Sequence, residues 1–271
     1  MPAGARWGFL ATAVLASACA PTLPRVDAGP AKAVVHAHSH NDYEHPRPLL
    51  DALNQNFNNI KTNLYWTGTD LGVSHSGPPF KGTLKDLYLD PLAARVAANG
   101  GSVAGDGRPF FLWLDLKEPG VELQNELANQ LSSYPMLTRF DDDHETPGAV
   151  TVVLTGDASA KKAMVARAAP RAWIRDSNDY SADDPPGDLR WGYYAVNYYS
   201  FLSWVGDGAS MPAAQRRQLE NLVNGAQAKG RKLRVYSSPD VPAYWTTARD
   251  LGMDFVGADD LAGLRSALDA K

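Results

Sequence analysis

The chain has 271 residues, of which 44% are hydrophobic and 21% are charged. This is the composition of a globular protein, and the length fits one α/β barrel or two smaller domains. The formal net charge is −4, so the chain lacks the excess of basic residues typical of nucleic-acid-binding proteins, and we expect no nucleic-acid partner.

The first 32 residues have the pattern of an export signal followed by a linker. Arg6 precedes an apolar run over 7–16 that is too short to span a membrane, and small residues and a Pro-rich tract follow it. The only cysteine, Cys19, follows Leu-Ala-Ser-Ala and resembles the lipidated cysteine of a bacterial lipobox. The alternatives are a lipid-anchored protein and a plainly secreted one. In both cases we expect export to the periplasm or cell envelope, membrane contact only through this anchor, and no internal disulfide.

From residue 33 onward, the hydrophobic pattern alternates between strands and helices. Strands are predicted over 33–40, 59–66, 110–117, 150–154, 172–176, 194–199, 232–237 and 253–258, with 70–75 as a hairpin return or an extension of the second strand. Helices are predicted over 46–57, 83–98, 121–133, 159–168, 213–229, 244–251 and 261–271, and a loop over 177–191. About eight strand-then-helix units indicate one (β/α)₈ barrel over 33–271. An open doubly wound sheet is the alternative, but no Gly-rich phosphate loop follows the first strand.

Three histidines, His36, His38 and His40, lie at alternate positions of the first predicted strand and therefore share one face of it. A single histidine at such a position is most often a half-buried structural residue. Three in register, followed directly by Asn41 and Asp42, indicate a site for proton transfer or metal binding.

Polar residues end several otherwise apolar strands, which is where barrel enzymes carry their chemistry. The clearest case is 110–117, which is apolar until Asp115 and Lys117. The other strand-end residues that we expect in a site are Asp42, Lys61, Asn63, His75, Asn197, Tyr199, Arg234 and Tyr236. For Arg234 the alternative is an ion pair with Asp176 or Asp259. The acidic stretch around His144 resembles a cluster of metal ligands, but we predict a solvated loop there.

These strand ends carry a family resemblance. The segments are His-Ser-His-Asn-Asp-Tyr at 38–43, Gly-Val-Ser-His at 72–75, Leu-Tyr-Leu-Asp-Pro-Leu at 87–92, Leu-Asp-Leu-Lys at 114–117 and Gly-Met-Asp-Phe-Val-Gly-Ala-Asp-Asp-Leu at 252–261. Together they resemble the phospholipase-C-like phosphodiesterase superfamily of barrels. Within it, the chain is most similar to proteins related to altered inheritance of mitochondria protein six, with glycerophosphodiester phosphodiesterases, phosphatidylinositol-specific phospholipases C and sphingomyelinase D as relatives.

The resemblance implies a phosphoric diester hydrolase in which two histidines act as general acid and base and a divalent ion neutralises the phosphate. Position by position, it implies His38 and His75 as the catalytic pair, with His40 second to His38. Each such group contributes roughly 10²–10⁴-fold to the rate. Asp115 takes the place of a metal-binding carboxylate. The residues expected to contact substrate are Asp42, Lys61, Lys117, Asn197, Tyr199, Arg234 and Tyr236.

One departure from the family pattern affects the metal. Relatives carry Glu-x-Asp as metal ligands where this chain has Lys61-Thr62-Asn63. A protonated lysine has no acceptor atom, although Asn63 retains a carbonyl oxygen that hard cations accept. We therefore expect Mg²⁺ or Ca²⁺ to bind weakly at Asp115 and Asn63, or not at all.

Three hypotheses follow from this departure. In the first, the Lys61 ammonium replaces the ion, as a basic side chain does in some bacterial phosphatidylinositol-specific members, and the protein is a metal-independent hydrolase of glycerophosphodiesters or phospholipid headgroups. In the second, the barrel has lost catalysis and is a binding protein of the envelope. In the third, Asp42 and Asp115 rebuild a site with a histidine, which favours Zn²⁺. We expect a monomer in each case.

Overall fold

The computed structural model describes Met1, residues 37–208 and residues 210–270. The predicted export signal, Cys19 and His36 lie outside these residues. None of the helices in the described part of the chain has both the length and the apolar character needed to cross a bilayer.

Eight parallel strands form a closed barrel, which confirms the predicted (β/α)₈ fold. Each strand pairs in parallel with its neighbour in the barrel, and β1 pairs with both β12 and β2, which closes the sheet. In barrel order the strands are β1 (Ala37–Ser39), β2 (Asn59–Trp66), β5 (Phe110–Leu116), β8 (Val150–Gly156), β9 (Ile174–Ser177), β10 (Trp191–Asn197), β11 (Lys232–Tyr236) and β12 (Phe255–Ala258).

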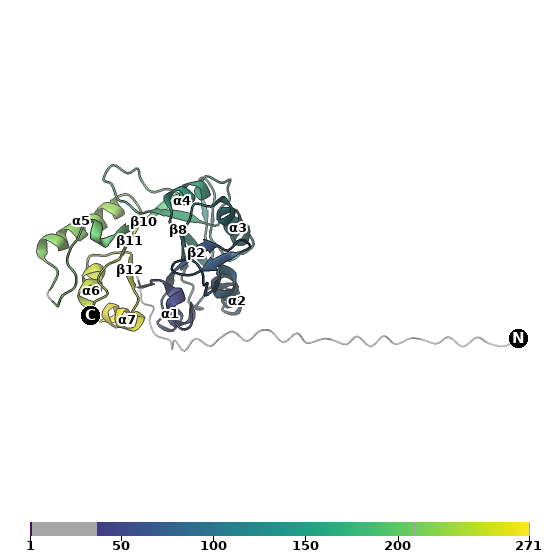
Figure 1. Cartoon of the computed structure of the whole chain (residues 1–271), viewed down its shortest axis with the longest axis horizontal. Coiled ribbons are helices and arrows are strands. Elements are labelled where there is room, and N and C mark those ends of the chain that lie inside the picture. Colours follow the sequence, from purple (N-terminus) through teal and green to yellow (C-terminus); the bar gives the residue numbers. More distant parts are fainter. Residues whose placement is uncertain (2–36, 209, 271) are drawn as a thin grey trace.

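The helices lie around the outside of this barrel (Figure 1). They are α1 (Leu50–Asn54), α2 (Asp90–Ala98), α3 (Val121–Ser132), α4 (Ala158–Val165), α5 (Ala213–Ala228), α6 (Pro242–Asp250) and α7 (Leu261–Asp269). Between β9 and β10 the chain runs through the predicted loop, and no helix lies there.

The structure differs from the predicted elements at three places. The helix predicted over 46–57 is only the short α1, because Leu49 has a positive φ of 65° and interrupts the turn before it. The helix predicted over 83–98 begins as a π-helix over Lys85–Leu89 and becomes α-helical only in α2. A small hairpin of β6 (Arg139–Phe140) and β7 (Glu145–Thr146) was not predicted, since two-residue strands are too short to show an alternating pattern.

The segment predicted as a hairpin return is one. Strand β3 (Leu71–Val73) runs antiparallel to the end of β2, and β4 (Gly82–Thr83) runs antiparallel to β3. This small sheet continues β2 beyond the barrel, so the loop after β3 lies near the carboxyl end of β2.

The core has two layers. Inside the barrel, Phe111, Trp113, Val153, Tyr193 and Phe255 form one apolar cluster, and a larger cluster fills the space between the strands and the helices. Inward-facing residues of neighbouring strands lie side by side and form layers across the barrel, which we call rings. Between β2 and β5, for example, the register places Lys61 beside Trp113 and Asn63 beside Asp115. The rings nearest the carboxyl ends are polar, and this is where a site can form.

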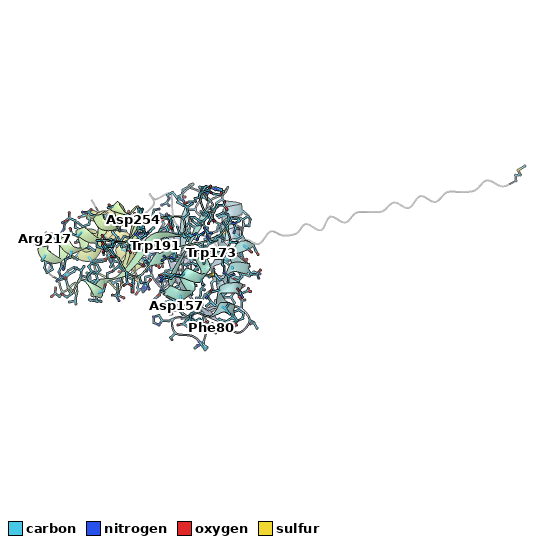
Figure 2. All side chains as sticks on the ribbon, turned by 90° about the horizontal axis from the view of Figure 1, so that it is seen from above. Phe80, Asp157, Trp173, Trp191, Arg217 and Asp254 are labelled. Atoms are coloured by element: carbon cyan, nitrogen blue, oxygen red, sulfur yellow. The ribbon has the colours of Figure 1, made fainter. Side chains whose placement is uncertain are left out.

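The two ends of the barrel are separated in Figure 2. Phe80 and Asp157, which follow the carboxyl ends of β3 and β8, lie on one side, and Asp254, directly before β12, lies on the opposite side. We call these the carboxyl face and the amino face.

Candidate active site

His38 is buried inside the barrel in the ring of Trp113. Its Nδ1 lies 2.9 Å from Oδ1 of Asn59, and its ring meets Trp113 edge-on with the centroids 5.9 Å apart. Burial lowers the pKa of His38 well below its usual range, and the nearby Arg234 charge adds to this effect. Because an amide oxygen only accepts, Nδ1 carries the proton, and Nε2 is left as an acceptor with no hydrogen-bond partner among the described residues.

His40 lies one ring further out, at the mouth of the barrel. Its Nδ1 lies 2.9 Å from Oδ1 of Asp259, and the side chain is 32% exposed. Burial lowers the pKa of His40, although the hydrogen bond that His40 donates to Asp259 works in the opposite direction. With Nδ1–H donated to the carboxylate, Nε2 is free to take a proton from a bound molecule, which is the arrangement of an oriented general base.

Two lysines share one carboxylate beside these histidines. The Lys61 ammonium lies 3.0 Å from Oδ2 of Asp115 and donates to Oδ1 of Asn41 at 2.8 Å, and the Lys117 ammonium lies 2.9 Å from the same Asp115 oxygen. Burial alone would raise the pKa of Asp115, but the two lysines outweigh it and lower that pKa. Burial lowers the pKa of Lys61 to about 8, so it remains mostly protonated at neutral pH. The cluster therefore carries one net positive charge.

This arrangement does not fit a divalent ion. Among the described residues, no group of three or more His, Cys, Asp or Glu side chains could hold a metal. Oδ2 of Asp115 is taken by two ammonium groups, and Asn63 donates its amide N–H to the Tyr43 hydroxyl at 2.8 Å. Oδ1 of Asp115 and Oδ1 of Asn63 are buried without a hydrogen-bond partner among the described residues, but two oxygens are too few ligands for Mg²⁺ or Ca²⁺. The Lys61 ammonium occupies the position at Oδ2 of Asp115 where a metal ion bound by this carboxylate would lie.

Asp42 serves the loop after β1. One of its carboxylate oxygens accepts from the Ser39 hydroxyl at 2.8 Å and the other from the Leu49 backbone N–H at 2.6 Å. The side chain is fully buried and points into the loop, away from the mouth, so Asp42 does not lie where it could contact a substrate as expected.

Arg234 is the unusual residue of the site. It is only 3% exposed, and its guanidinium lies 4.7 Å from the centroid of the Trp113 ring. Neither ion pair considered from the sequence forms, because Asp176 is bound by Lys161 and Asp259 by His40. In the part of the chain that the structure describes, Arg234 has no carboxylate partner, and its Nε has no acceptor.

A cavity of about 100 Å³ opens beside this guanidinium on the carboxyl face. Arg234, His38, His40 and Tyr236 line it, together with the loop that follows β11. Two carboxylates, Asp240 and Asp259, also line it; Asp259 is bound to His40, and Asp240 accepts from the backbone N–H groups of Asp259 and Asp260. In that loop Ser237 has a positive φ of 57°, a conformation that costs energy for a residue other than glycine. The cavity has room for one phosphate-sized group.

Of the remaining residues expected from the sequence, Tyr236 lines this cavity, whereas His75, Asn197 and Tyr199 are not among the residues that line it. His75 is exposed on the loop after β3, and its carbonyl oxygen accepts from the Tyr65 hydroxyl at 3.1 Å. Asn197 caps the short helix after β10 by accepting from the Tyr199 N–H at 3.0 Å. Tyr199 is 54% exposed, whereas Tyr236 is half-buried beside Arg234.

Sequence reasoning missed two features of the site. Asp259 was considered as a partner of Arg234 but not of His40, because the predicted barrel places the first and last strands side by side without fixing their register. The buried ion pair of Lys161 and Asp176 was also missed, because Lys161 reaches inward from α4 and a lysine on a helix is usually solvated. Asn178 accepts a second hydrogen bond from the same ammonium at 2.7 Å.

Comparison with known proteins identifies the family. The model of the AIM6-like phosphodiesterase domain matches residues 31–176, which is more than half of the chain. The chain belongs to the AIM6-like phosphodiesterase domain family. It is similar to altered inheritance of mitochondria protein 6 of Lachancea thermotolerans, with 25% identity over an alignment 280 residues long, which covers 84% of this chain and 64% of the relative.

Solved structures support the fold of this AIM6-like domain. A glycerophosphodiester phosphodiesterase from Parabacteroides distasonis is similar over 88% of this chain and 98% of its own, with 12% identity and a TM-score of 0.51. A glycerophosphodiester phosphodiesterase from Agrobacterium tumefaciens covers 87% of this chain and 100% of its own, with 12% identity and a TM-score of 0.48. The similarity to the Parabacteroides distasonis structure shows that the AIM6-like chain shares its barrel fold.

Proposed function

We propose that this AIM6-like domain hydrolyses phosphodiesters at the carboxyl face of the barrel without a divalent metal. The observation that carries this proposal is the Arg234 guanidinium, buried without a carboxylate beside a cavity of about 100 Å³. Leaving a buried charge unpaired costs several kcal/mol. An anion that enters the cavity removes that cost, and a phosphodiester carries the single negative charge that is missing.

In the proposed mechanism, the phosphate binds between Arg234 and the lysine cluster. The planar guanidinium offers two parallel N–H donors to phosphate oxygens, while its face stays on Trp113. Lys61 and Lys117 have one positive charge left after Asp115 is neutralised, and this charge stabilises the negative charge that develops during transfer.

Proton transfer is assigned to His40 and His75. His40 Nε2 takes a proton from the attacking water while the new P–O bond forms, and Asp259 stabilises the resulting imidazolium. His75, which is exposed on the loop after β3, is assigned the proton donated to the leaving oxygen as the old P–O bond breaks. His38 is assigned a positioning role, since it is buried beneath the cavity and neutral.

The size of the cavity supports the proposed substrate class. A volume of about 100 Å³ admits the phosphate, so the organic groups on both ester oxygens lie outside it. We propose glycerophosphodiesters and phospholipid headgroups as substrates.

The test is turnover of bis(p-nitrophenyl) phosphate and glycerophosphocholine by the purified protein in EDTA. We expect turnover that is unaffected by the chelator and falls at least 10²-fold in His40→Gln, with His144→Gln as a matched exposed control. Asp259→Asn should shift the acidic limb of the pH–rate profile, because the carboxylate orients and supports the His40 imidazole. Equal activity of His40→Gln and the wild type would overturn the mechanism.

A second function, phosphodiester binding without turnover, is favoured by the replacement of the metal ligands at Lys61 and Asn63. Calorimetry with glycerophosphocholine separates the two. Binding that depends on Arg234, with no turnover of either substrate, would establish the binding protein and exclude the hydrolase.

A further inference from the structure

The exposed large hydrophobic side chains are distributed unevenly over the molecule. Apart from Met1, those of the described residues are Val121, Tyr199 and Val205, with exposed fractions of 56%, 54% and 59%. Val121 is the first residue of α3, directly after the loop that follows β5, and the other two lie between β10 and α5. All three are therefore at the carboxyl face, the end that holds the candidate active site. Single exposed hydrophobic residues are common, but their restriction to one end of the barrel requires a cause.

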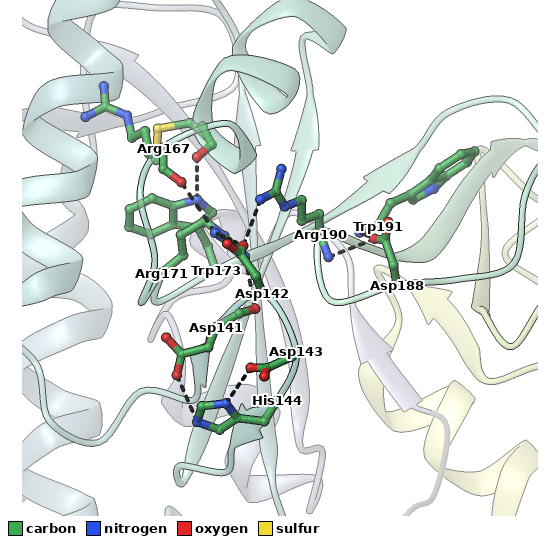
Figure 3. A network of polar contacts seen from close by, with 11 residues as sticks. Asp141, Asp142, Asp143, His144, Arg167, Arg171, Trp173, Asp188, Arg190 and Trp191 are labelled. Atoms are coloured by element: carbon green, nitrogen blue, oxygen red, sulfur yellow. Dashed lines mark hydrogen bonds and ion pairs between the residues drawn. The ribbon is translucent and has the colours of Figure 1, made fainter.

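The amino face presents charged side chains instead (Figure 3). The turn of the β6–β7 hairpin exposes Asp142, Asp143 and His144, and Arg190 is exposed directly before β10. These groups bind one another, since Asp142 accepts from Arg190 at 2.7 Å and Nδ1 of His144 lies 2.9 Å from Asp143. A surface of this kind is well solvated, so the two ends of the barrel differ in polarity.

The segment between β10 and α5 is built to hold its apolar side chains outward. Tyr198 and Trp204 are buried, and the Tyr198 hydroxyl donates to the Trp204 carbonyl oxygen at 2.8 Å. Oε1 of Gln215, on α5, accepts from the Trp204 backbone N–H at 2.8 Å and ties the segment to the helix. Tyr199 and Val205 directly follow these two buried residues and are exposed. The segment is thus fixed from within and displays two apolar side chains.

The positions of the exposed side chains fit a flat partner. β5 and β10 are three strands apart in a barrel of eight, so Val121 lies across the mouth from Tyr199 and Val205. Phe80, between β3 and β4, also lies at this face (Figure 2). A protein interface needs a contiguous patch with an apolar centre, whereas a lipid bilayer accepts separate side chains. Tyrosine is also enriched at the boundary between membrane and water.

The charges around these side chains indicate the kind of lipid. The residues within two positions of the three apolar ones include two acidic residues, Glu122 and Asp207, and no lysine or arginine. Lys81, near Phe80, is paired with Glu44 at 3.1 Å. Anionic lipids attract proteins through clusters of basic residues. Because no such cluster adjoins the apolar side chains, a zwitterionic bilayer is the fitting surface.

We infer that the carboxyl face of the barrel binds the surface of a zwitterionic phospholipid bilayer through Val121, Tyr199 and Val205. The inference rests on the proposed function in one respect, namely that a phosphate-sized cavity at this face leaves the rest of a phospholipid in the bilayer. The contact is made by the barrel itself and is separate from a lipid anchor at Cys19.

The first test uses the fact that Cys19 is the only cysteine of the chain. The full-length Cys19→Ser protein has no anchor and accepts a single nitrobenzoxadiazole label at an introduced cysteine. We expect the emission of labels at Val121→Cys and Val205→Cys to rise at least about twofold when phosphatidylcholine vesicles are added, because the label enters an apolar layer. Asp143→Cys is the matched control, since Asp143 is exposed at the amino face, and its label should not respond.

The second test is sedimentation of the unlabelled Cys19→Ser protein with phosphatidylcholine vesicles. Val121→Ser with Val205→Ser should lower the partition coefficient at least about fivefold, and adding Tyr199→Ser should lower it further. Phosphatidylserine in the vesicles should not strengthen binding. Turnover of bis(p-nitrophenyl) phosphate, which is soluble in water, should be the same in the double valine variant as in the parent.

Three results would overturn the inference: no response at either label position, an equal response at Asp143→Cys, or a partition coefficient unchanged in the double valine variant. The apolar side chains would then be left to a protein partner. The two proposals fail separately. Vesicle binding without turnover of any phosphodiester overturns the hydrolase and leaves this inference standing, whereas turnover without vesicle binding overturns this inference alone.

Discussion

Replacing Arg234 by methionine should make the protein more stable and less active. Arg234 is 3% exposed and unpaired, so folding moves a cation out of water without an opposite charge in contact. That desolvation costs several kcal/mol. The guanidinium recovers about 0.5–2 kcal/mol from its contact with Trp113. Methionine has a similar length and no charge, so we expect the free energy of unfolding to rise by about 1–3 kcal/mol.

Arg231→Met is the matched control. Arg231 is equally buried and also stacks on an indole ring, with its guanidinium 3.5 Å from the Trp191 centroid. Unlike Arg234, it donates four hydrogen bonds, to the carbonyl oxygens of Pro185, Pro186 and Trp191 and to the Tyr194 hydroxyl. Its removal leaves those acceptors unsatisfied, and we expect a loss of about 3–5 kcal/mol.

Urea unfolding of both variants gives the sign of each change, and turnover of bis(p-nitrophenyl) phosphate gives the second readout. Arg234→Met should lose at least about 10²-fold in kcat/KM while it gains stability. A structural arginine would lose both together. If Arg234→Met is destabilised by as much as Arg231→Met, the buried charge is compensated within the protein, and the argument that it awaits an anion fails.

Three further predictions concern the same end of the barrel. Lys161→Met should lower the free energy of unfolding by about 3–5 kcal/mol, because Asp176 would be left buried and unpaired. Adding Asp176→Leu should recover most of this loss. A loss below about 1 kcal/mol in urea unfolding of Lys161→Met would contradict the prediction. Lys61→Glu with Asn63→Asp should create a Mg²⁺ or Ca²⁺ site measurable by calorimetry, whereas the wild type should show none. Burial lowers the pKa of His38, so below about pH 6.5 this histidine binds a proton in the unfolded chain but not in the folded one. The free energy of unfolding should therefore fall by up to about 1.4 kcal/mol for each pH unit below that value. His38→Gln should lower the drop in melting temperature between pH 7.5 and 5.5, and an equal drop in both proteins would refute this.

The fold was largely predictable, because long strands and helices carry strong periodic signals. The barrel closes as expected, and the return of the chain after β2 was also anticipated. The elements that were missed are short or depend on single backbone angles, such as the two-residue strands of the β6–β7 hairpin and the positive φ of Leu49. Local sequence does not encode such features strongly enough to be read.

The site was predictable in its parts but not in its pairings. The residues at the carboxyl ends were identified from the strand pattern alone. Which histidine faces the mouth was not, because alternation places His38 and His40 on the same face and does not say how deep each lies. Depth depends on the strand register of the closed barrel, in which His38 lies beside Gly257 of β12.

If Lys61 takes the place of a metal ion, as proposed, the gathering of several cations at this mouth is explained. A divalent ion supplies two charges at one point, whereas an ammonium supplies one charge and three donors. The charge of Lys61 is balanced by the Asp115 carboxylate, so the second lysine, Lys117, is needed to leave a net positive charge there. Arg234 then adds a further charge, which forms no ion pair with a carboxylate of the described residues, although Asp176 and Asp115 lie close enough to act on it. An ammonium also titrates, and the pKa of Lys61 is lowered to about 8 by burial, so this site loses positive charge in mildly alkaline solution where a bound metal ion would keep it.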